Sequence, residues 1–405
     1  MRELLEESFR AAVAAADPLA ILAPHLPKPP QGRTFVAAAG KAAASMALAV
    51  ENNWSASLEG IAVTRYKHGL PTKRIRVVEA GHPIPDEAGE QASREILAAI
   101  RSLGENDLLL ALVSGGGSSL LSLPAPGVSM ADLKSLTTRL LRSGADIREM
   151  NTVRKHLSAI AGGRLAAASH APVVALIISD VVGDDPTHIA SGPCAPDPTI
   201  IGDAKAVLAK YDIESRWLFS ETPKPGDAVF SKVENRVIAT AHRSLEAAAE
   251  VFRKNNIEPV ILGDTITGEA REVAKVMAAL VREIRTYSRP FKPPVALISG
   301  GECTVTVRGA GGRGGRCSEF LLSLGIELGD VWAIAADTDG IDGSEDNAGA
   351  FLFPDSLARA RAKTLDPGAL LAENDSYGFF ASLGDLLVTG PTRTNVNDYR
   401  AIIVR

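Results

Sequence analysis

The sequence predicts an α/β protein with two α/β/α-type domains built on mostly parallel sheets. Short β-branched runs alternate along the chain with longer segments rich in alanine and leucine, as strands alternate with helices in this class. Most predicted strands are continuous apolar runs, which is typical of parallel strands buried on both faces. A length of 405 residues exceeds what one ordinary core organises, so two domains are expected.

Twelve short apolar or β-branched runs are predicted to be strands. In chain order they are Thr34–Ala39, Gly60–Thr64, Ile75–Glu79, Asp107–Val113, Pro172–Ser179, Arg236–Thr240, Pro259–Leu262, Pro294–Ser299, Cys303–Val307, Val331–Ala336, Leu386–Thr389 and Tyr399–Val404. Good helix formers fill segments between them, namely Lys41–Glu51, Asp86–Ser102, Met130–Ser143, Val153–Ser169, Arg243–Lys254, Gly268–Thr286 and Cys317–Gly329.

One polar segment, Tyr211–Asn235, interrupts this alternation. It contains Pro223 and Pro225 and little periodicity, which favours an inter-domain connection, with an exposed loop inside one domain as the alternative. We therefore expect one domain over residues 1–225 and another over 236–405, with the N-terminal helix free to pack on either. Ligands usually bind at the carboxyl ends of parallel strands, so the active site is expected in the cleft between the domains.

The composition argues against several classes of protein. Hydrophobic residues at 46% and charged residues at 22% are ordinary globular values, and a net charge of -5 leaves no basic surplus for nucleic acid. No apolar run of about 18 residues predicts a membrane span, and the acidic start lacks the features of a signal peptide. Three unpaired cysteines fit a reducing cytoplasm. We expect a cytoplasmic monomer or homodimer that acts on small molecules, without nucleic-acid or membrane partners.

Three glycine-dense stretches, each near an apolar run, are the strongest functional signal. They are Ser114–Ser119, Ser299–Glu302 and Gly311–Arg316. A strand that ends in glycines and hydroxyls leaves backbone N–H groups able to converge on an anion, and consecutive glycines are entropically costly as mere packing. The first stretch supplies the candidate phosphate-binding residues Gly115, Gly116, Gly117, Ser118 and Ser119. The pattern favours a polyphosphate site and phosphoryl transfer, with a purely structural turn as the alternative.

Two basic residues stand where an anion would be held. Lys41 follows the first predicted strand at a strand-to-helix turn, where the helix dipole favours negative charge. The turn is not a Walker A loop, which requires G-x-x-x-x-G-K-[ST]. Arg316 precedes a predicted helix, and its guanidinium matches phosphate or carboxylate oxygens. A solvated lysine and a flexible glycine hairpin remain the alternatives.

Acidic residues and histidines also follow predicted strands. Asp180 and Asp185 could hold Mg²⁺ or take a proton from a hydroxyl, although Asp185 could instead cap the following turn. The segment Asp337–Gly343 allows the same two interpretations, ligand binding or a turn. His68 and His82 each follow a strand and could line a cleft, while a structural histidine is the alternative for both.

Eight motifs occur in a fixed order along the chain. They are Gly40–Ala43, Gly81–Pro83, Ser114–Ser119, Ser179–Pro193, Ser299–Glu302, Gly312–Glu319, Asp337–Gly343 and Gly390–Asp398. Together they resemble the class II glycerate 2-kinases, also called the MOFRL family, some of whose members carry the label hydroxypyruvate reductase. The resemblance spans residues 5–404.

This resemblance implies two α/β domains and transfer of the γ-phosphoryl group of ATP, with Mg²⁺, to the C2 hydroxyl of D-glycerate. The family's catalytic lysine and arginine fall on Lys41 and Arg316. Asp180 would then serve as base or, like Asp185, as a metal ligand. The carboxylate of the acceptor needs a cation or an amide nest of its own; Arg154 or Arg393 could supply the cation, and His82 is a further candidate for contact with the substrate.

The chain departs from the family pattern at two places. Cys317 and Ser318 stand where the family usually has Asn-Gln, and Arg393 stands where a small residue is usual. An added arginine would favour a more acidic or longer acceptor, such as a four-carbon sugar acid. Two other functions stay open: reduction of hydroxypyruvate by NAD(P)H, for which no G-x-G-x-x-G follows the first strand, and a non-catalytic module that binds a sugar phosphate.

Overall fold

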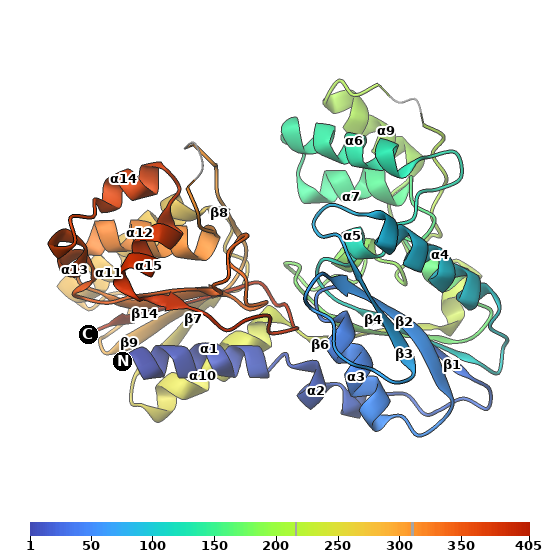
Figure 1. Ribbon diagram of the computed structural model, residues 1–405, viewed down its shortest axis with the longest axis horizontal. Coiled ribbons are helices and arrows are strands. Elements are labelled where there is room, and N and C mark those ends of the chain that lie inside the picture. Colours follow the sequence, from blue (N-terminus) through green and yellow to red (C-terminus); the bar gives the residue numbers. More distant parts are fainter. Residues whose placement is uncertain (215–216, 309–311) are drawn as a thin grey trace. The chain divides into compact units, whose positions relative to one another are not determined.

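The computed structural model describes residues 1–214, 217–308 and 312–405, and it divides into two compact units (Figure 1). The inserted unit is Asp17–Ile238, and the terminal unit combines Met1–Ala16 with Ala239–Arg405. These limits differ from the expected domains, 1–225 and 236–405. The described residues of Tyr211–Asn235 lie inside the inserted unit, because the strand that begins at Val233 still pairs in that unit's sheet. The N-terminal helix belongs to the terminal unit.

The inserted unit is built on a six-stranded sheet of order β3-β2-β1-β4-β5-β6. Its strands are β1 Thr34–Ala39, β2 Leu58–Arg65, β3 Ile75–Ala80, β4 Leu108–Val113, β5 Val173–Ile178 and β6 Val233–Ala239. The pairs from β3 through β5 are all parallel, as the sequence predicted. Successive strands are added toward one edge of the sheet from β1 to β3 and toward the other edge from β4 onward. In open α/β sheets, ligands bind at such a change of strand order, beyond the carboxyl ends of the strands.

Helices cover this sheet and form a separate layer beside it. They are α2 Pro18–Ile21, α3 Ala43–Asn53, α4 Glu87–Arg101, α5 Gly117–Leu120, α6 Met130–Arg142, α7 Ile147–Lys155, α8 Arg164–Ala167 and α9 Ile201–Lys210, with 3₁₀ turns η1 Ala23–His25, η2 Ile189–Ser191 and η3 Ala228–Lys232. Alternate residues of β1, such as Phe35 and Ala37, share a core with Ile96 and Ile100 of α4. Helices α6, α7 and α9 enclose a second small core.

The helix predicted over Val153–Ser169 is wrong. Helix α7 ends at Lys155, and the helical path resumes only at Arg164. Gly162 and Gly163 have φ angles of +62° and +82°, outside the helical region. Within the intervening segment, Ser158 instead forms an antiparallel β-bridge with Pro124. Long-range pairing therefore overrides the helical propensity of this alanine-rich segment.

The terminal unit has a six-stranded sheet of order β13-β12-β11-β14-β9-β7. Its strands are β7 Glu258–Gly263, β9 Val295–Ser299, β11 Trp332–Asp337, β12 Gly349–Leu352, β13 Leu386–Leu387 and β14 Asp398–Val404, and β8 Gly268–Glu269 pairs separately with β10 Cys303–Thr304. Among the described residues of this sheet, β7 and β9 pair in parallel and the other four strand pairs are antiparallel. The sheet is mixed, whereas the sequence had predicted mostly parallel strands.

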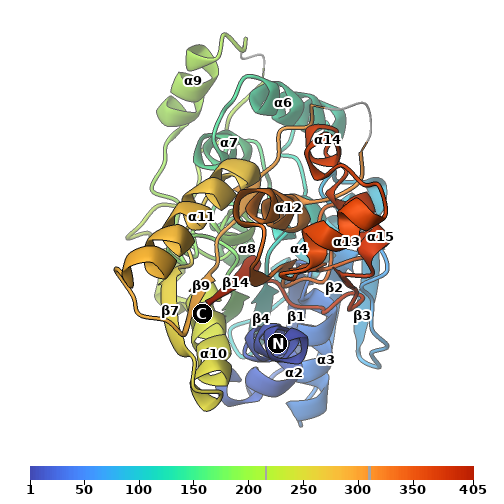
Figure 2. The ribbon, with the colours of Figure 1, turned by 90° about the vertical axis from the view of Figure 1, so that its left-hand side faces the viewer.

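Two helical layers bury the two faces of this mixed sheet (Figure 2). The helices are α1 Arg2–Ala14, α10 Ala241–Lys254, α11 Ala270–Tyr287, α12 Arg316–Leu328, α13 Ser356–Ala362, α14 Pro367–Ala372 and α15 Ser376–Leu383. Alternation along β14 divides the two cores: Ala401 and Ile403 pack with α1 and α10, while Ile402 and Val404 pack with α11 and α12.

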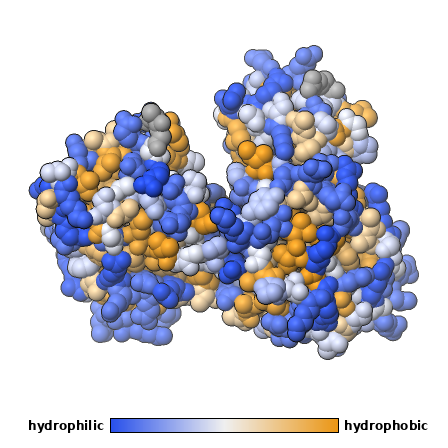
Figure 3. Space-filling view, viewed as in Figure 1, coloured by the Kyte–Doolittle hydropathy of each residue, from blue (hydrophilic) through white to orange (hydrophobic). Residues whose placement is uncertain are grey.

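The surface mixes polar and apolar side chains. On the face drawn in Figure 3, hydrophilic residues are spread over both units and are interrupted by apolar patches. Across the ranges that the structure describes, no helix is both long enough and apolar enough to cross a bilayer.

Candidate functional site

The turns after β1 and β4 are tied together by backbone hydrogen bonds in the inserted unit. The Lys41 amide donates to the Gly115 carbonyl at 2.8 Å, and the Ala42 amide donates to Ser114 Oγ at 3.1 Å. Gly40 has a φ angle of +127°, and a Cβ there would lie 2.1 Å from Ser114 Oγ. Glycine is therefore required where the two strands end together, and Lys41 is held beside the three-glycine turn.

Lys41 and His82 both lie against Gly116. A Cβ at Gly116 would lie 2.8 Å from His82 Nε2 and 3.5 Å from Lys41 Cγ, and the φ angle of Gly116 is +79°. His82 lies in the turn after β3, two residues beyond the end of that strand. The structure thus brings together three features that the sequence had singled out separately: a lysine, a histidine and a glycine turn.

The glycine turn has spare backbone donors. Over the described residues, the amides of Gly115, Gly116 and Ser118 have no acceptor within the protein. Ser119 is engaged differently, because its hydroxyl donates to the Gly116 carbonyl at 3.1 Å. Adjacent unused N–H groups beside a lysine are the arrangement that binds an anionic oxygen.

A second group of polar side chains surrounds Ser118. Its hydroxyl lies 2.8 Å from Ser191 Oγ, and Ser191 Oγ donates to Asn151 Oδ1 at 3.2 Å. Arg154 donates to the Ser118 carbonyl at 3.0 Å, and burial lowers the pKa of this guanidinium. Ala190 and Ser191 have φ angles of +50° and +61°, which is a costly conformation for residues other than glycine.

Sequence reasoning did not single out Ser191 or Asn151. The segment around Ser191 is one of the ordered motifs, but no spacing rule relates it to residue 118 or 151. Their meeting depends on the path of the chain between α7 and η2. A signal was nevertheless present, because Asn151 and Arg154 are three positions apart and so lie on one face of a helix.

The acidic candidates follow β5, the neighbour of β4 in the sheet. Asp180 is half-buried and lies two residues beyond the end of β5. Asp185 accepts a hydrogen bond from the Thr187 amide at 2.9 Å, the turn-capping role given above as its alternative. Burial opposes ionisation of Asp185, but the bonds from Thr187 together with attraction to His188 and Lys155 lower its pKa.

The donor chemistry of these two aspartates fits Mg²⁺. This ion takes oxygen ligands and usually binds through one or two carboxylates, substrate phosphates and water, rather than through an all-protein cage. In the described ranges, no group of three or more His, Cys, Asp or Glu is arranged to hold a metal. Either aspartate therefore supplies a ligand of the right type.

In the terminal unit, three carboxylates surround the guanidinium of Arg316, the first residue of α12. Arg316 Nε donates to Asp398 Oδ1 at 2.7 Å. Nη1 donates to Glu302 Oε1 and Nη2 to Asp337 Oδ2, both at 2.8 Å. Although burial opposes it, the three carboxylates raise the pKa of Arg316. Among the described contacts, three of the five guanidinium N–H groups are used, which leaves two for a ligand.

The antiparallel direction of β14 explains how these carboxylates meet. Asp337 is the last residue of β11 and pairs in register with Asp398, the first residue of β14. Arg400 pairs with Ser299, the last residue of β9 and the residue before the second glycine loop. The start of one strand therefore lies beside the carboxyl ends of two others. The sequence identified Asp337–Gly343 and Gly390–Asp398 as motifs but gave no indication of this meeting.

A buried carboxylate closes the start of α12. Asp342 accepts hydrogen bonds from the amides of Cys317 and Ser318 at 2.9 and 2.8 Å, and from the Ser318 hydroxyl at 2.6 Å. Burial raises the pKa of Asp342 to about 6, although these hydrogen bonds act in the opposite direction. A Cβ at Gly315 would lie 2.1 Å from Asp342 Oδ1, so glycine is needed immediately before Arg316.

Arg393 lies in a loop that packs on the turn after β11. The Thr392 amide donates to the Asp339 carbonyl at 3.0 Å, and its hydroxyl donates to the Thr338 carbonyl at 2.6 Å. Arg393 has a φ angle of +60°, a conformation that favours glycine. Arg316 and Arg393 thus belong to the terminal unit, while the other predicted site residues belong to the inserted unit.

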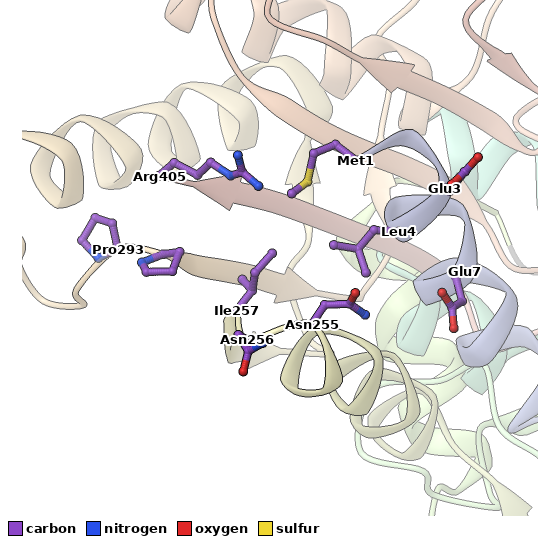
Figure 4. A pocket seen from close by; sticks show the side chains of 10 residues that line it. Met1, Glu3, Leu4, Glu7, Asn255, Asn256, Ile257, Pro293 and Arg405 are labelled. Carbon is purple, nitrogen blue, oxygen red and sulfur yellow. The ribbon is translucent and has the colours of Figure 1, made fainter.

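A separate cavity of about 770 Å³ in the terminal unit contains none of the predicted site residues (Figure 4). It is lined by the start of α1, the end of α10 and the segment before β9, including Glu7, Asn255 and Pro293. Its shape reflects the junction of three elements. The converging donors described above, rather than cavity volume, mark the candidate site.

Known families and proteins resemble this chain over most of its length. Residues 4–219 match DUF4147, a domain family of unknown function, and residues 295–398 match the MOFRL family. A protein of Agrobacterium vitis with the provisional name hydroxypyruvate reductase is 50% identical over 100% of this chain and 94% of its own length. A glycerate 2-kinase of Pyrococcus horikoshii is 43% identical over 92% of this chain and 88% of its own.

A solved structure extends the likeness to the fold. The crystal structure of glycerate kinase from Thermotoga maritima superposes with a TM-score of 0.89 at 39% identity, covering 100% of this chain and 99% of the other. With both domain matches, full-length relatives and a shared fold, the chain belongs to the MOFRL-containing glycerate 2-kinase family.

Proposed function

We propose that this protein is an ATP-dependent kinase that transfers the γ-phosphoryl group to the C2 hydroxyl of D-glycerate, giving 2-phosphoglycerate. The observation that carries the proposal is the bond from the Lys41 amide to the Gly115 carbonyl, which fixes a lysine beside unused amides. Relatives with 43% and 40% identity are named glycerate 2-kinases, which supports this acceptor.

The reaction needs positioning and charge neutralisation more than covalent help. The C2 oxygen attacks the γ-phosphorus and loses its proton to a base, while the bond to the bridging oxygen breaks and ADP leaves. The amides of Gly115, Gly116 and Ser118 would hold phosphate oxygens of the nucleotide. Lys41 and Arg316 would neutralise the charge that shifts on the transferring group.

Asp180 would accept the proton of the C2 hydroxyl or, with Asp185, hold Mg²⁺ bound to the nucleotide. When bound, that ion would neutralise charge on the phosphate oxygens. Both aspartates follow β5, which pairs with β4 in the sheet. Asp185 already accepts a hydrogen bond from the Thr187 amide.

The acceptor carboxylate would be recognised by cations outside the phosphate site. His82 and Arg154 lie near the glycine turn, and Arg393 lies in the loop after β13. Because the family usually has a small residue at position 393, the arginine favours a more acidic acceptor, such as a four-carbon sugar acid. The buried, unpaired thiols of Cys194, Cys303 and Cys317 support action in a reducing cytoplasm.

The test couples the product directly to enolase. The protein is incubated with ATP, Mg²⁺ and D-glycerate, and enolase is added without phosphoglycerate mutase. Immediate formation of phosphoenolpyruvate is expected, because enolase accepts 2-phosphoglycerate and not 3-phosphoglycerate. ADP without phosphoenolpyruvate would identify the C3 hydroxyl as the acceptor and refute the proposed position.

Two further assays separate the alternatives. ADP formation with four-carbon sugar acids but not with glycerate would keep the kinase and correct its substrate. Oxidation of NADH by hydroxypyruvate, without ADP formation from any acid, would overturn the kinase in favour of the reductase. The turn after β1 is Gly40-Lys41-Ala42-Ala43 rather than a dinucleotide-binding G-x-G-x-x-G, which supports the kinase.

A further inference from the structure

Arg400 is a buried cation that the chemistry above does not use. Its side chain, at the third position of β14, is 1% exposed. Its guanidinium donates to the Gly300 carbonyl at 2.9 Å and to Asp398 Oδ2 at 2.8 Å, and lies 5.4 Å from the centre of the Phe320 ring. Burying a guanidinium is costly unless its partners are well placed. The cost of burying this guanidinium therefore suggests that Arg400 has a functional role.

Asp398 connects Arg400 to Arg316. Residues two apart on a strand face the same side, so Asp398 and Arg400 lie next to each other along β14. One carboxylate oxygen accepts from Arg400 at 2.8 Å, and the other accepts from Arg316 Nε at 2.7 Å. The side chain of Asp398 is fully buried. A carboxylate held on both oxygens has little freedom, so it fixes the direction of the Arg316 guanidinium.

Arg400 also anchors the loop that carries another partner of Arg316. Its bond to the Gly300 carbonyl holds the turn after β9, and its Nη2 lies 3.2 Å from Cys303 Sγ. Between these two positions stands Glu302, which accepts from Arg316. Arg400 therefore supports two of the three carboxylates that surround Arg316.

Charge leads to the same conclusion. Glu302, Asp337 and Asp398 carry three negative charges, which Arg316 and Arg400 reduce to a net charge of -1. Without Arg400 the cluster would carry -2, which would repel a phosphoryl group more strongly. A buried positive charge behind Asp398 offsets this repulsion.

We propose that Arg400 is a positioning residue that acts through Asp398 and the Gly300–Glu302 turn to orient Arg316 for the transferring phosphoryl group. The proposal rests on the kinase function given above. A lysine at this position keeps the charge but lacks the planar fork that reaches the Asp398 carboxylate and the Gly300 carbonyl together. Arg400→Lys therefore separates geometry from charge.

The kinetic test compares Arg400→Lys with a matched variant, Arg271→Lys. Arg271 is also buried in the terminal unit, 8% exposed, and bonded to a buried carboxylate, Glu319, at 2.7 Å, but it does not contact the carboxylates around Arg316. Arg400→Lys should lower kcat about tenfold or more and leave KM for ATP within about twofold, as expected for a lost transition-state contact. Arg271→Lys should lose stability with kcat retained. Equal kcat values in the two variants would overturn the proposal.

A double-mutant cycle with Arg316→Ala tests whether the effect passes through Arg316. In the Arg316→Ala background, adding Arg400→Lys should change kcat less than twofold. The same loss with and without Arg316 would show that Arg400 acts by another route. If Arg400→Lys does not fold, Arg400→Gln is measured in its place, because its side-chain amide can still donate hydrogen bonds.

A spectroscopic readout separates this proposal from the kinase assignment. The Nε–H resonance of Arg316, assigned with Arg316→Lys, should be sharp and slowly exchanging in the wild type and in Arg271→Lys. It should broaden or exchange faster in Arg400→Lys. An unchanged resonance would refute the positioning role even in an active kinase. An inactive wild type would refute the kinase assignment, and the resonance would still decide whether Arg400 orders Arg316.

Discussion

Lys41 illustrates what one residue contributes when its backbone and side chain have separate tasks. Its amide ties the β1 turn to Gly115, while its side chain passes over Gly116. A truncation of the side chain leaves the amide bond in place. Function and fold are therefore separable at this position.

Lys41→Ala should lower kcat by roughly 10²–10³-fold, the usual cost of one lost donor to a developing negative charge. The free energy of unfolding should change by less than about 1 kcal/mol, as at other partly exposed positions. Steady-state kinetics and urea unfolding measure the two effects. Lys205→Ala, at an exposed position of α9, serves as the control. Near wild-type turnover in folded Lys41→Ala would remove Lys41 from the mechanism.

Arg393 carries a cost in stability that its proposed role in acceptor recognition would explain. Because its φ angle is +60°, Arg393→Gly should raise the free energy of unfolding by about 1 kcal/mol. If Arg393 binds an acidic acceptor, the same change should raise KM for that acceptor at least fivefold. Ser288→Gly, at a φ angle of +54° after α11, should gain stability without any effect on KM. An unchanged KM in Arg393→Gly would exclude the arginine from substrate binding.

At the scale of elements, the start of α12 brings together the helix end, the turn that contains Asp342 and the site residue Arg316. Asp342 closes this helix end, and burial raises its pKa to about 6 from an ordinary value of 3.8. A raised carboxyl pKa means that the folded state binds the proton more tightly than the unfolded state. Ionised Asp342 therefore lowers the free energy of unfolding, and this penalty is complete above about pH 6. It disappears as the pH falls toward about 4.

Asp342→Asn removes this titration and tests the sign. Relative to the variant, the wild type should gain free energy of unfolding as the pH is lowered from 7 to 5, by at most about 1.4 kcal/mol per pH unit. Urea unfolding of both proteins at the two pH values gives the difference. A wild-type advantage that stays constant or shrinks at low pH would contradict the raised pKa.

Helices and strands were predicted correctly where a local apolar pattern defines them, and incorrectly where pairing with distant segments defines them. The sequence predicted Thr34–Ala39 with its observed bounds, because a continuous apolar run has one interpretation in an α/β protein. It missed β12, Gly349–Leu352, which is short and depends on pairing with β11 and β13. The helix predicted over Val153–Ser169 failed for a related reason, since distant contacts break it.

The same distinction applies to the site. Lys41, His82 and the three-glycine turn were foreseeable, because residues that follow parallel strands gather at one sheet edge. The partners of Arg316 were not. Under the expected parallel sheet, Asp398 at the start of its strand would lie at the opposite edge from Asp337. Only the antiparallel direction of β14 brings the two together, and no local pattern encodes that direction.

At the scale of the whole molecule, the two units should respond separately to damage. Phe9 in α1 is 1% exposed and packs in one core with Phe252 of α10 and Tyr399 of β14. Phe9→Ala should cost about 3–5 kcal/mol in the terminal unit. Hydrogen exchange should accelerate in α10 and β11 and stay unchanged in β1 and β4. Phe35→Ala, in the inserted unit, should give the reverse pattern. Uniform acceleration in both units would show that they unfold as one.

The membership of α1 in the terminal unit has a consequence for synthesis. The Tyr399 hydroxyl donates to Ser8 Oγ at 2.8 Å, and the Thr394 hydroxyl donates to the Ala16 carbonyl at 2.7 Å, so these bonds join residues made hundreds of codons apart. Domains fold largely in the order in which they emerge from the ribosome. The inserted unit completes its sheet while α1 still presents a bare apolar face. Helix α1 can complete its packing only after β14 has been synthesised, so a holding chaperone could bind its exposed apolar face in that interval.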